Sequence, residues 1–543
     1  MANLRILDNS HVNGADLLIV GGILYDGTGS VGVSADIAIA GDRIAAIGPN
    51  LRATMTAGRV IDATGLIVSP GFIDIHTHSD LSVLINPRME SSIHQGVTTE
   101  VVGNCGMAAG VITPDAAFAL ERRWLERGGI APDWTSFGGF LSRVEESGVA
   151  INICSLTGHG SIRKKVMGSA NRVPSATEAA EMLDIVTRCM DEGAVGLSTG
   201  LEYLPGGYAN VDEIVPLAEA ARLAGGFYAS HIRNEGDTLV ESIAEAIAVG
   251  ERTGIAVQLS HHKAEGHKNW GKIQTTLKMM ADARSRGLDV LTDQYPYTAF
   301  MTGLPVIILP AWAMGGEPED MVARLQEPES RAKVLEEIAL DPPDWALIQV
   351  GIARNRRDLQ GKTLAEVAEV EGKSPAEAAL DLIIGESGWV GAAHFALSEA
   401  DVETIMADPH TMIGSDGVSA SPDGILGEDK THPRTYGTFP RVLGEYVREK
   451  GVLTLGEAIR RMTALPAKRI GLIDRGRLAV GMKADIVVFN AGTVADVADF
   501  DNPHRFAIGI EQVIVNGRVA LSGGVQVDVR EGRVLRRAAA GVA

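Results

Sequence analysis

Two histidines separated by one residue end an apolar run near the start of the chain. The run is GFIDIHTH, and it contains His76 and His78. On an extended chain, residues two apart point to the same side, so this pair can bind one metal ion or two adjacent ions. Two polar residues at the end of a strand would give the same pattern. Ligand-type residues at equivalent places elsewhere in the chain decide between the two interpretations.

Three more residues that can bind a metal also follow short apolar runs. Cys105 lies in GNCG, His231 in YASHIRNEG, and either His261 or His262 in QLSHHKAEG. We assign His261 to the site because it continues the alternation of its run, and we expect His262 to face neighbouring helices. Imidazole nitrogen and thiolate sulfur are the ligands that zinc prefers. The set therefore predicts a zinc site.

A carboxylate completes the set. Asp416 lies in IGSDG, again at the end of an apolar run. Ser-Asp-Gly in isolation is a turn signal. Beside a metal ion, however, a carboxylate can take a proton from the attacking water and return it to the leaving group. We therefore expect Asp416 to act as the general base and acid.

Eight short buried runs alternate with amphipathic helical stretches through the middle of the chain. This alternation is typical of parallel βα units, and eight of them predict a TIM-like (β/α)8 barrel. Catalytic side chains in such barrels come from the carboxyl ends of the strands, which is where the candidate residues lie. The runs begin near residues 71, 97, 150, 194, 226, 255, 288 and 411.

Both chain ends and one long gap depart from this alternation. Residues 1–67 and 475–543 contain short β-type runs with glycine turns, which predicts a small antiparallel β-sandwich made from both ends of the chain. The barrel would then span residues 68–474. More than a hundred residues separate the seventh and eighth runs, so we expect an insertion at about 302–393.

Composition limits the function classes. The 543-residue chain has a formal net charge of −20, which repels phosphate backbones and argues against a nucleic-acid partner. The sequence contains no apolar run that predicts a membrane span and no signal-peptide pattern, so we expect a cytoplasmic protein. Three cysteines without CxxC spacing exclude a disulfide framework, and Cys154 and Cys189 are expected to be buried thiols. The sequence leaves open whether the protein forms a homo-oligomer.

Taken together, the motifs resemble those of the amidohydrolase superfamily, and specifically its N-acyl-D-amino-acid deacylase (D-aminoacylase) family. The resemblance runs from about Asp16 to Val529. It implies a zinc-dependent enzyme that hydrolyses the amide bond of N-acyl-D-amino acids to a carboxylate and a free D-amino acid. The motifs that carry it are PGFIDIHTHSD, QGVTTEVVGNCG, STGLEYLPG, ASHIRNEG, SHHK, DQYPYTA, IGSDG, HPRTYGTFPR and GMKADIVVFN.

The resemblance also implies roles for individual residues. Cys105, His231 and His261 would hold one tight zinc ion. His76 and His78, sharing Cys105, would form a second, weaker site. The small-molecule N-acyl amino acid would be held through its carboxylate by four residues, namely Tyr203, Lys263, Tyr295 and Arg434.

Two other functions are considered. A cyclic amide or imide hydrolase of the dihydroorotase or hydantoinase kind uses the same barrel. The fourth run, AVGLSTGL, lacks the lysine that bridges two metals in many amidohydrolases, and GNCG supplies a cysteine instead, which argues against this alternative. A non-catalytic scaffold could lose its ligands without penalty, yet all are present.

The sequence also suggests a preference among substrates. Glu202, beside Tyr203, would favour substrates with neutral side chains over acidic ones.

Overall fold

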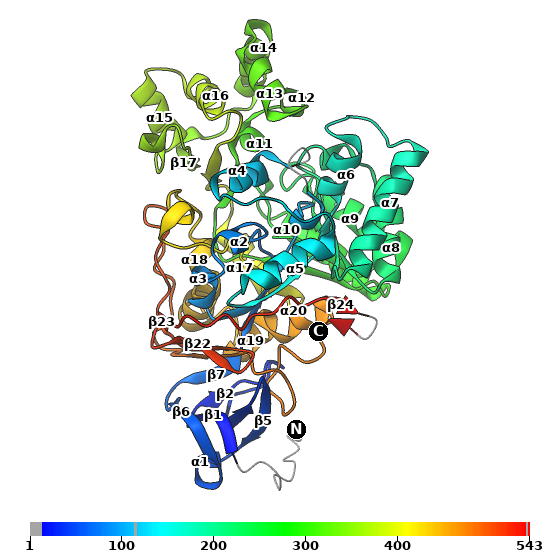
Figure 1. Cartoon of the computed structure of the whole chain (residues 1–543). Helices are drawn as coiled ribbons and strands as arrows, with labels where there is room; N and C mark the ends of the chain where they lie inside the picture. Colours follow the sequence, from blue (N-terminus) through cyan, green and yellow to red (C-terminus); the bar gives the residue numbers. More distant parts are fainter. Residues whose placement is uncertain (1–13, 113–116, 539–540, 543) are drawn as a thin grey trace.

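The computed structural model describes residues 14–112, 117–538 and 541–542. Residues 1–13, 539–540 and 543 of the predicted terminal domain therefore lie outside the described residues. Figure 1 shows three parts stacked on one another: strands β1–β7 at one end, a body of strands and helices in the middle, and helices α11–α16 at the other end.

Parallel strands form the centre of the middle part. Three of them pair in the order β10-β9-β8, and six more pair in the order β11-β12-β13-β14-β15-β19. Their bounds are β8 (Phe72–Asp74), β9 (Val97–Val102), β10 (Asn152–Ser155), β11 (Thr157–Gly158), β12 (Gly196–Gly200), β13 (Phe227–His231), β14 (Val257–Leu259), β15 (Val290–Gln294) and β19 (Thr411–Ile413).

The two parallel sheets approach each other at both edges. The chain passes from β10 into β11 through the single residue Leu156. At the other edge, Thr77 beyond β8 forms a parallel bridge with Gly417 beyond β19. The observed strands coincide with the eight predicted runs, and the fold is of the mixed α/β, TIM-barrel type that the alternation predicted.

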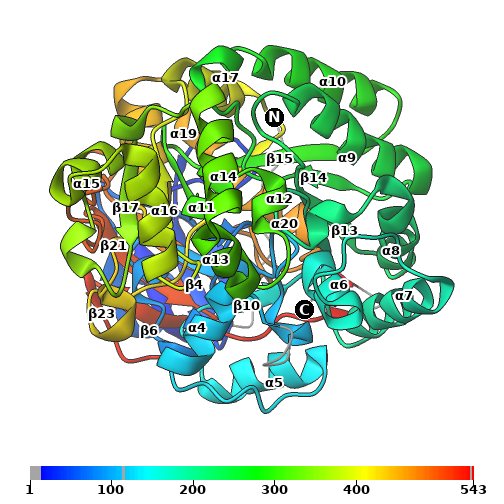
Figure 2. The same cartoon turned by 90° about the horizontal axis from the view of Figure 1, so that it is seen from above.

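Helices surround these strands, as the view along the strands in Figure 2 shows. Their buried faces are apolar; α7, for example, buries Met182, Val186 and Cys189. The longer helices are α5 (Phe137–Ser147), α6 (His159–Met167), α7 (Ala176–Asp191), α8 (Val211–Leu223), α9 (Leu239–Thr253), α10 (Ile273–Ser285), α17 (Glu399–Ala407), α18 (Arg434–Arg441), α19 (Leu455–Met462) and α20 (Ala464–Ile470).

The segment between β15 and β19 has a core of its own. Three antiparallel strands pair in the order β16-β18-β17, and Leu325, Val350 and Ile383 belong to an apolar cluster separate from that of the central strands. The elements are β16 (Phe300–Gly303), α11 (Leu304–Ile308), α12 (Ala311–Met314), α13 (Pro318–Gln326), α14 (Pro328–Leu340), β17 (Ile348–Ile352), α15 (Leu364–Glu371), α16 (Pro375–Gly385) and β18 (Gly391–His394). In Figures 1 and 2 these helices lie over one end of the central strands.

Two sheets form the remaining part, and both chain ends contribute to one of them. Their orders are β5-β4-β1-β6 and β23-β22-β21-β20-β7-β2-β3. Ile19 and Ile37 of the first sheet share an apolar core with Ile486 and Ile514 of the second. The strands are β1 (Gly14–Val20), β2 (Ile23–Leu24), β3 (Val33–Ser34), β4 (Asp36–Ala40), β5 (Arg43–Gly48), β6 (Thr56–Asp62), β7 (Ile67–Pro70), β20 (Ile486–Phe489), β21 (Ile510–Val515), β22 (Arg518–Ser522) and β23 (Val525–Gln526).

The predicted antiparallel pairing of the N-terminal strands is wrong in part. β1 pairs with β6 in parallel, with Leu17 opposite Arg59, and β2 pairs with β7 in parallel. After β5 the chain passes through the short helix α1 (Leu51–Thr54) and enters β6. This strand lies beside β1, on the side away from β4. Alternation of apolar residues reports which face of a strand is buried, but it does not report the direction of the neighbouring strand.

The two other expectations from composition can be compared with the described residues. Cys154 and Cys189 are buried free thiols, as predicted. Within the described part of the chain, no helix combines the length and the apolar character needed to cross a membrane.

Candidate metal centre and active site

The predicted ligand residues gather at one edge of the parallel strands because each lies at or just beyond the carboxyl end of its strand. His231 is the last residue of β13. The others follow their strands by two to four residues: His76 and His78 after β8, Cys105 after β9, His261 after β14 and Asp416 after β19. The carboxyl ends of parallel strands meet at one edge, so residues far apart in sequence converge there.

Cys105 lies at the centre of this cluster. Its Sγ is 3.3 Å from Nε2 of His76 and 3.5 Å from Nε2 of His261. Nδ1 of His231 lies 2.8 Å from the same Nε2 of His261. The side chains make two overlapping groups, in each of which the ligand atoms lie within 4.8 Å of one another: Cys105, His231 and His261, and His76, His78, Cys105 and Asp416.

The donor set and its spacing fit zinc. Bond lengths of about 2.0–2.1 Å to nitrogen and about 2.3 Å to sulfur place the ligand atoms of a tetrahedral zinc roughly 3.3–3.6 Å apart. The separations from Cys105 Sγ, 3.3 Å to His76 and 3.5 Å to His261, lie in this range, whereas the 2.8 Å between His231 and His261 is shorter and would have to widen around an ion. Cys105, His231 and His261 are all buried. A closed group of thiol and imidazole donors is the kind of site that zinc prefers among divalent ions.

The electrostatic surroundings favour the thiolate form of Cys105. Burial raises the pKa of this thiol, but the charges of His76 and His78 outweigh burial and bring the pKa well below its usual range. The thiolate is the form of cysteine that binds metal ions. Cys105 is therefore prepared to act as a ligand.

Asp416 contacts both the ligand cluster and a cation. Its Oδ1 lies 3.1 Å from Nε2 of His78 and 3.4 Å from Nε2 of His76, and its Oδ2 lies 2.7 Å from Nη1 of Arg434. Burial raises the pKa of this carboxyl group, but Arg434 and His261 hold it well below its usual range. Asp416 is thus ionised at neutral pH, as a general base must be.

Unusual backbone geometry directs three of these side chains. Cys105, His261 and Asp416 have φ values of 52°, 33° and 51°. These lie in the left-handed region, which residues other than glycine rarely adopt and which is enriched at functional sites. Gly200, at the end of β12, has no side chain, and a Cβ there would collide with the carbonyl oxygen of Cys105. The glycine thereby lets the Cys105 loop pack against β12.

Carboxylates that the sequence analysis did not assign hold the imidazole rings. Asp293 Oδ1 lies 3.2 Å from Nδ1 of His76 and accepts a hydrogen bond from the backbone N–H of His261. Glu235 Oε1 lies 3.0 Å from Nδ1 of His261. Such contacts fix the orientation of a ring and raise its basicity as a ligand. Asp293 could have been noticed as an acidic residue inside the seventh apolar run, whereas Glu235 lies in a loop without any periodic signal.

Comparison with known proteins identifies the family. A sequence profile described as "Amidohydrolase family" matches residues 59–521. This chain belongs to the amidohydrolase family. It is 39% identical to an N-acyl-D-glutamate deacylase of Alcaligenes xylosoxydans xylosoxydans, over 96% of each chain. It is 36% identical to a D-aminoacylase of the same organism, over 97% of this chain and 98% of the relative.

A solved structure gives the same result. The crystal structure of an N-acyl-D-glutamate deacylase from Bordetella bronchiseptica matches this amidohydrolase with a TM-score of 0.82 and 36% identity, over 96% of this chain and 100% of that one. That structure contains zinc and a phosphonate inhibitor that mimics the tetrahedral intermediate. The family predicted from the sequence motifs is confirmed.

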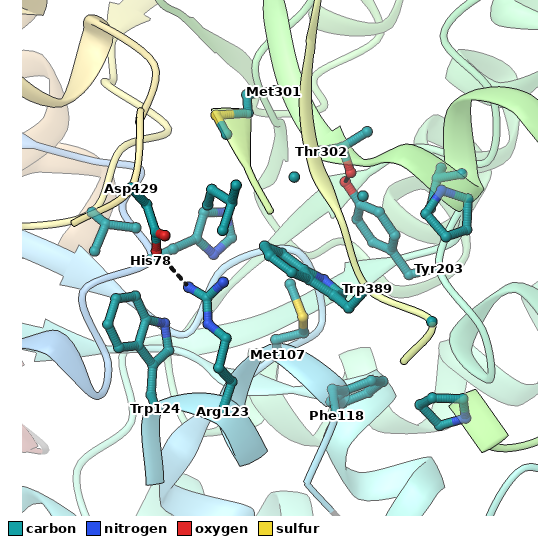
Figure 3. A pocket seen from close by; sticks show the side chains of 18 of the residues that line it. His78, Met107, Phe118, Arg123, Trp124, Tyr203, Met301, Thr302, Trp389 and Asp429 are labelled. Carbon is teal, nitrogen blue, oxygen red and sulfur yellow. Dashed lines mark hydrogen bonds and ion pairs between the residues drawn. The ribbon is translucent and has the colours of Figure 1, made fainter. Parts of the chain in front are cut away.

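The ligand cluster of this amidohydrolase borders a cavity of about 350 Å³. His78 and Asp416 line it, together with Tyr203 and Arg434, two of the four residues implied to bind substrate. Figure 3 shows Tyr203 beside Thr302 in the cavity wall, and their hydroxyl oxygens are 3.3 Å apart. Tyr203 and Arg434 therefore lie where a substrate next to the metal cluster would meet them.

Lys263 and Tyr295 occupy a different place. They line a separate small space of about 10 Å³. The Nζ of Lys263 donates to both carboxylate oxygens of Glu235, at 2.6 and 2.7 Å. The charged groups of Lys263 and Arg434 lie 5.6 and 4.8 Å from the centre of the Tyr295 ring. The structure thus pairs Lys263 with a carboxylate of the protein itself.

Two neighbouring polar residues have different partners, one on a helix and one within the ligand cluster. His262 is 2.9 Å from the hydroxyl of Thr276 on α10, so it faces the helices as predicted. Glu202 Oε2 lies 2.9 Å from Nε2 of His231. The charge of Glu202 is therefore directed at the His231 ring.

Proposed function

We propose that this protein hydrolyses the amide bond of N-acyl-D-amino acids to a carboxylate and a free D-amino acid, with zinc as its cofactor. The main support is the buried group of Cys105, His231 and His261 beside the ionised carboxylate of Asp416, which lines a cavity large enough for a small substrate. The names of the similar proteins point to the same reaction.

The roles of the ligands follow from their grouping. Cys105, His231 and His261 would hold the tight zinc ion, and His76 and His78, sharing Cys105, would form the second, weaker site. Bound zinc polarises an acyl carbonyl and lowers the pKa of water towards about 7.

Asp416 moves the proton in this scheme. Its carboxylate accepts a proton from the attacking water and donates it to the amide nitrogen as the C–N bond breaks. Arg434, 2.7 Å away, keeps the carboxylate ionised before the attack. Asp293 and Glu235 keep the imidazole rings oriented during the reaction.

We propose that the substrate α-carboxylate binds at Tyr203 and Arg434. A carboxylate is best held by a cation and a hydroxyl donor, and both line the cavity. In this proposal Lys263 and Tyr295 also contact the substrate α-carboxylate. Lys263 would then donate to the substrate carboxylate in place of Glu235. The net charge of −20 favours such a small molecule over nucleic acid as the partner.

We also propose the domain division that the sequence suggested. A closed eight-stranded barrel would span residues 68–474, with an insertion at about 302–393 and a β-sandwich from residues 1–67 and 475–543. The direct passage from β10 to β11 and the bridge between Thr77 and Gly417 support closure. A cytoplasmic location and a homo-oligomeric state stay predictions.

Stereochemistry tests the proposed function. With the α-carboxylate and the acyl carbon both fixed, the side chain on Cα has one open direction, so only one enantiomer fits. N-acetyl-D-leucine should be hydrolysed faster than N-acetyl-L-leucine by a large factor when both products are quantified. Comparable rates would contradict the proposal. Hydrolysis of hydantoin without hydrolysis of either leucine derivative would indicate a cyclic amide hydrolase.

A further inference from the structure

A largely buried arginine lines the same cavity as His78 and Asp416 of the ligand cluster. Arg123 comes from α4 (Ala119–Arg127), and its side chain is 11% exposed. Its guanidinium carbon lies 4.7 Å from the ring centre of Trp124 and 4.4 Å from that of Trp389, which belongs to the segment between β15 and β19. Figure 3 shows the guanidinium group beside both indoles, with Asp429 at its tip.

Three cationic side chains line this cavity, and Arg123 has the most distant acidic partner. An oxygen and a nitrogen 3.8 Å apart are too far for a hydrogen bond. The other two cations have carboxylates within hydrogen-bond distance. The closest separations are 2.9 Å for Lys164 and Glu317, 2.7 Å for Arg434 and Asp416, and 3.8 Å for Arg123 and Asp429.

Asp429 is already engaged by another arginine. Arg354 Nη2 lies 2.7 Å from its Oδ2, so Arg123, Arg354 and Asp429 together carry one net positive charge. Nε and Nη1 of Arg123 are buried without a hydrogen-bond partner among the residues that the structure describes. Burial and the charge of Arg354 lower the pKa of Arg123 to about 9, at which it stays protonated at neutral pH. A buried cation with unused donors favours an anionic partner.

We propose that Arg123 binds a second carboxylate of the substrate, in addition to the α-carboxylate. The substrate class would be N-acyl-D-amino acids that carry this further carboxylate on the amino-acid side chain or at the far end of the acyl group. The planar guanidinium fork matches a carboxylate. The two indoles hold the fork in place and exclude water, which strengthens the interaction. This inference rests on the proposed function.

The charge of Glu202 bears on this assignment. From the sequence, Glu202 favoured neutral side chains because it stands beside Tyr203. In the structure its Oε2 is 2.9 Å from Nε2 of His231. Glu202 also lines the cavity, but its carboxylate is paired with an imidazole of the ligand cluster. The expectation of neutral side chains stays a prediction, which the test below decides.

The test compares charged substrates with neutral ones of the same shape. In the first comparison, kcat/KM is measured for N-acetyl-D-glutamate and for N-acetyl-D-glutamine. The ratio of the two values shows whether the enzyme binds a carboxylate on the amino-acid side chain. The second comparison takes the ratio for N-succinyl-D-leucine to that for N-butanoyl-D-leucine, and reports an acyl carboxylate. The wild type is measured beside Arg123→Met, which removes the charge and keeps an unbranched chain, and Arg123→Lys, which keeps the charge.

The wild type should prefer the charged member of one pair. Arg123→Met should lower that ratio roughly 10- to 100-fold, the size expected for a hydrogen bond to a charged group. The loss should appear mainly in KM, because the contact is present before and during the reaction. Arg123→Lys should recover part of it. Arg122→Met is the matched control, because Arg122 precedes Arg123 in α4 and instead faces Glu317 and Glu319; its ratio should equal that of the wild type.

The outcomes separate this inference from the function on which it rests. Hydrolysis of the neutral substrates with no charge preference in either comparison contradicts the Arg123 assignment alone. An equal fall of the ratio in Arg122→Met would contradict it too, because the fall would then come from a general change in helix α4 and not from the Arg123 side chain. If Arg123→Met does not fold, the wild-type ratios and those of Arg123→Lys still show whether the enzyme prefers charged substrates. Failure to hydrolyse all four compounds contradicts the proposed function, and the inference falls with it.

Discussion

At the scale of single residues, Cys105 connects the two ligand groups because its thiol belongs to both. Its pKa is brought well below the usual range by His76 and His78 in spite of burial. The thiol of Cys154 donates to the backbone carbonyl of Glu100 in β9, and burial raises its pKa to about 12. Cys105, just beyond β9, and Cys154, within the neighbouring β10, therefore differ in chemistry because of what surrounds them.

Alkylation can detect this difference. Cys105 should resist a thiol reagent in the zinc form and react after chelation, whereas Cys154 should stay unreactive in both because its thiol remains protonated. Mass spectrometry of the labelled peptides gives the result. Cys105→Ser should also weaken zinc binding, with Cys154→Ser as the matched control. Equal labelling of Cys105 in both states would show that its thiol is not a metal ligand.

Asp416→Asn tests proton transfer at the same scale. The amide keeps the size of the side chain but cannot accept the water proton, so kcat should fall by about two to four orders of magnitude while zinc content stays unchanged. Because the pKa of Asp416 lies well below its usual range, any acidic limb that it causes should lie below about pH 4 in the wild type and be absent from the variant. Zinc content and kcat are measured on one preparation. Unchanged kcat would remove Asp416 from the mechanism, and loss of zinc would make it chiefly a ligand.

The sequence predicted the cluster of candidate ligands better than the groups that contact it. His76, Cys105 and His231 could be found because metal-binding side chains recur after apolar runs. The contact between Asp293 and His76 joins residues 217 positions apart, and only the packed strands bring them together. Likewise, the pairing of Lys263 with Glu235 depends on the loop after β13, for which the sequence shows no periodic signal.

At the scale of elements, helix α4 brings a buried acid close to the cavity. Glu121 is two residues before Arg123 and is buried. Burial and the charge of Asp80 raise the pKa of Glu121 to about 7. The folded protein therefore binds a proton at this position more tightly than the unfolded chain, where the pKa of a glutamate is about 4.3. The resulting stability is fully present below about pH 4 and is lost as the pH rises towards 7.

Glu121→Gln should remove this dependence. Relative to the wild type, the variant should gain stability between pH 5 and pH 8, by roughly 3 kcal/mol at most, since each pKa unit corresponds to about 1.4 kcal/mol. Urea unfolding at the two pH values measures the gain. Glu126→Gln, on the exposed side of the same helix, should show none. An equal effect of Glu121→Gln at both pH values would contradict the raised pKa.

Element positions were largely predictable, and pairing partners less so. The eight central runs correspond to observed strands because parallel strands buried on both faces are continuously apolar. The parallel pairing of β1 with β6 was missed because it depends on the path of α1 between β5 and β6. A local pattern does not record that path.

At the scale of the whole molecule, the segment between β15 and β19 has its own apolar core and contributes Trp389 and Met301 to the cavity wall. Its core is separate from that of the central strands, so the two parts can lose structure separately. The proposed metal ligands all lie in the central part. The sequence predicted an insertion from the long gap between two runs, but the closeness of Trp389 to Arg123 required the folded structure.

Leu325→Ala tests this separation. Leu325 is fully buried in the core of the segment, and truncation of such a residue costs about 2–5 kcal/mol. The variant should become sensitive to proteolysis within about residues 302–393 while its zinc content stays unchanged. Leu340→Ala, at a position that is 85% exposed, is the control and should behave as the wild type. Joint loss of zinc and of resistance to protease would mean that the parts fold as one unit.

The central claim is that zinc held at Cys105, His231 and His261 is required for hydrolysis of an N-acyl-D-amino acid. The most direct test is a zinc titration of metal-stripped protein, with release of the free D-amino acid as the readout. The account predicts no activity without metal and a rise in activity that reaches its maximum near one zinc per chain. Full activity in protein shown to contain no metal would contradict it.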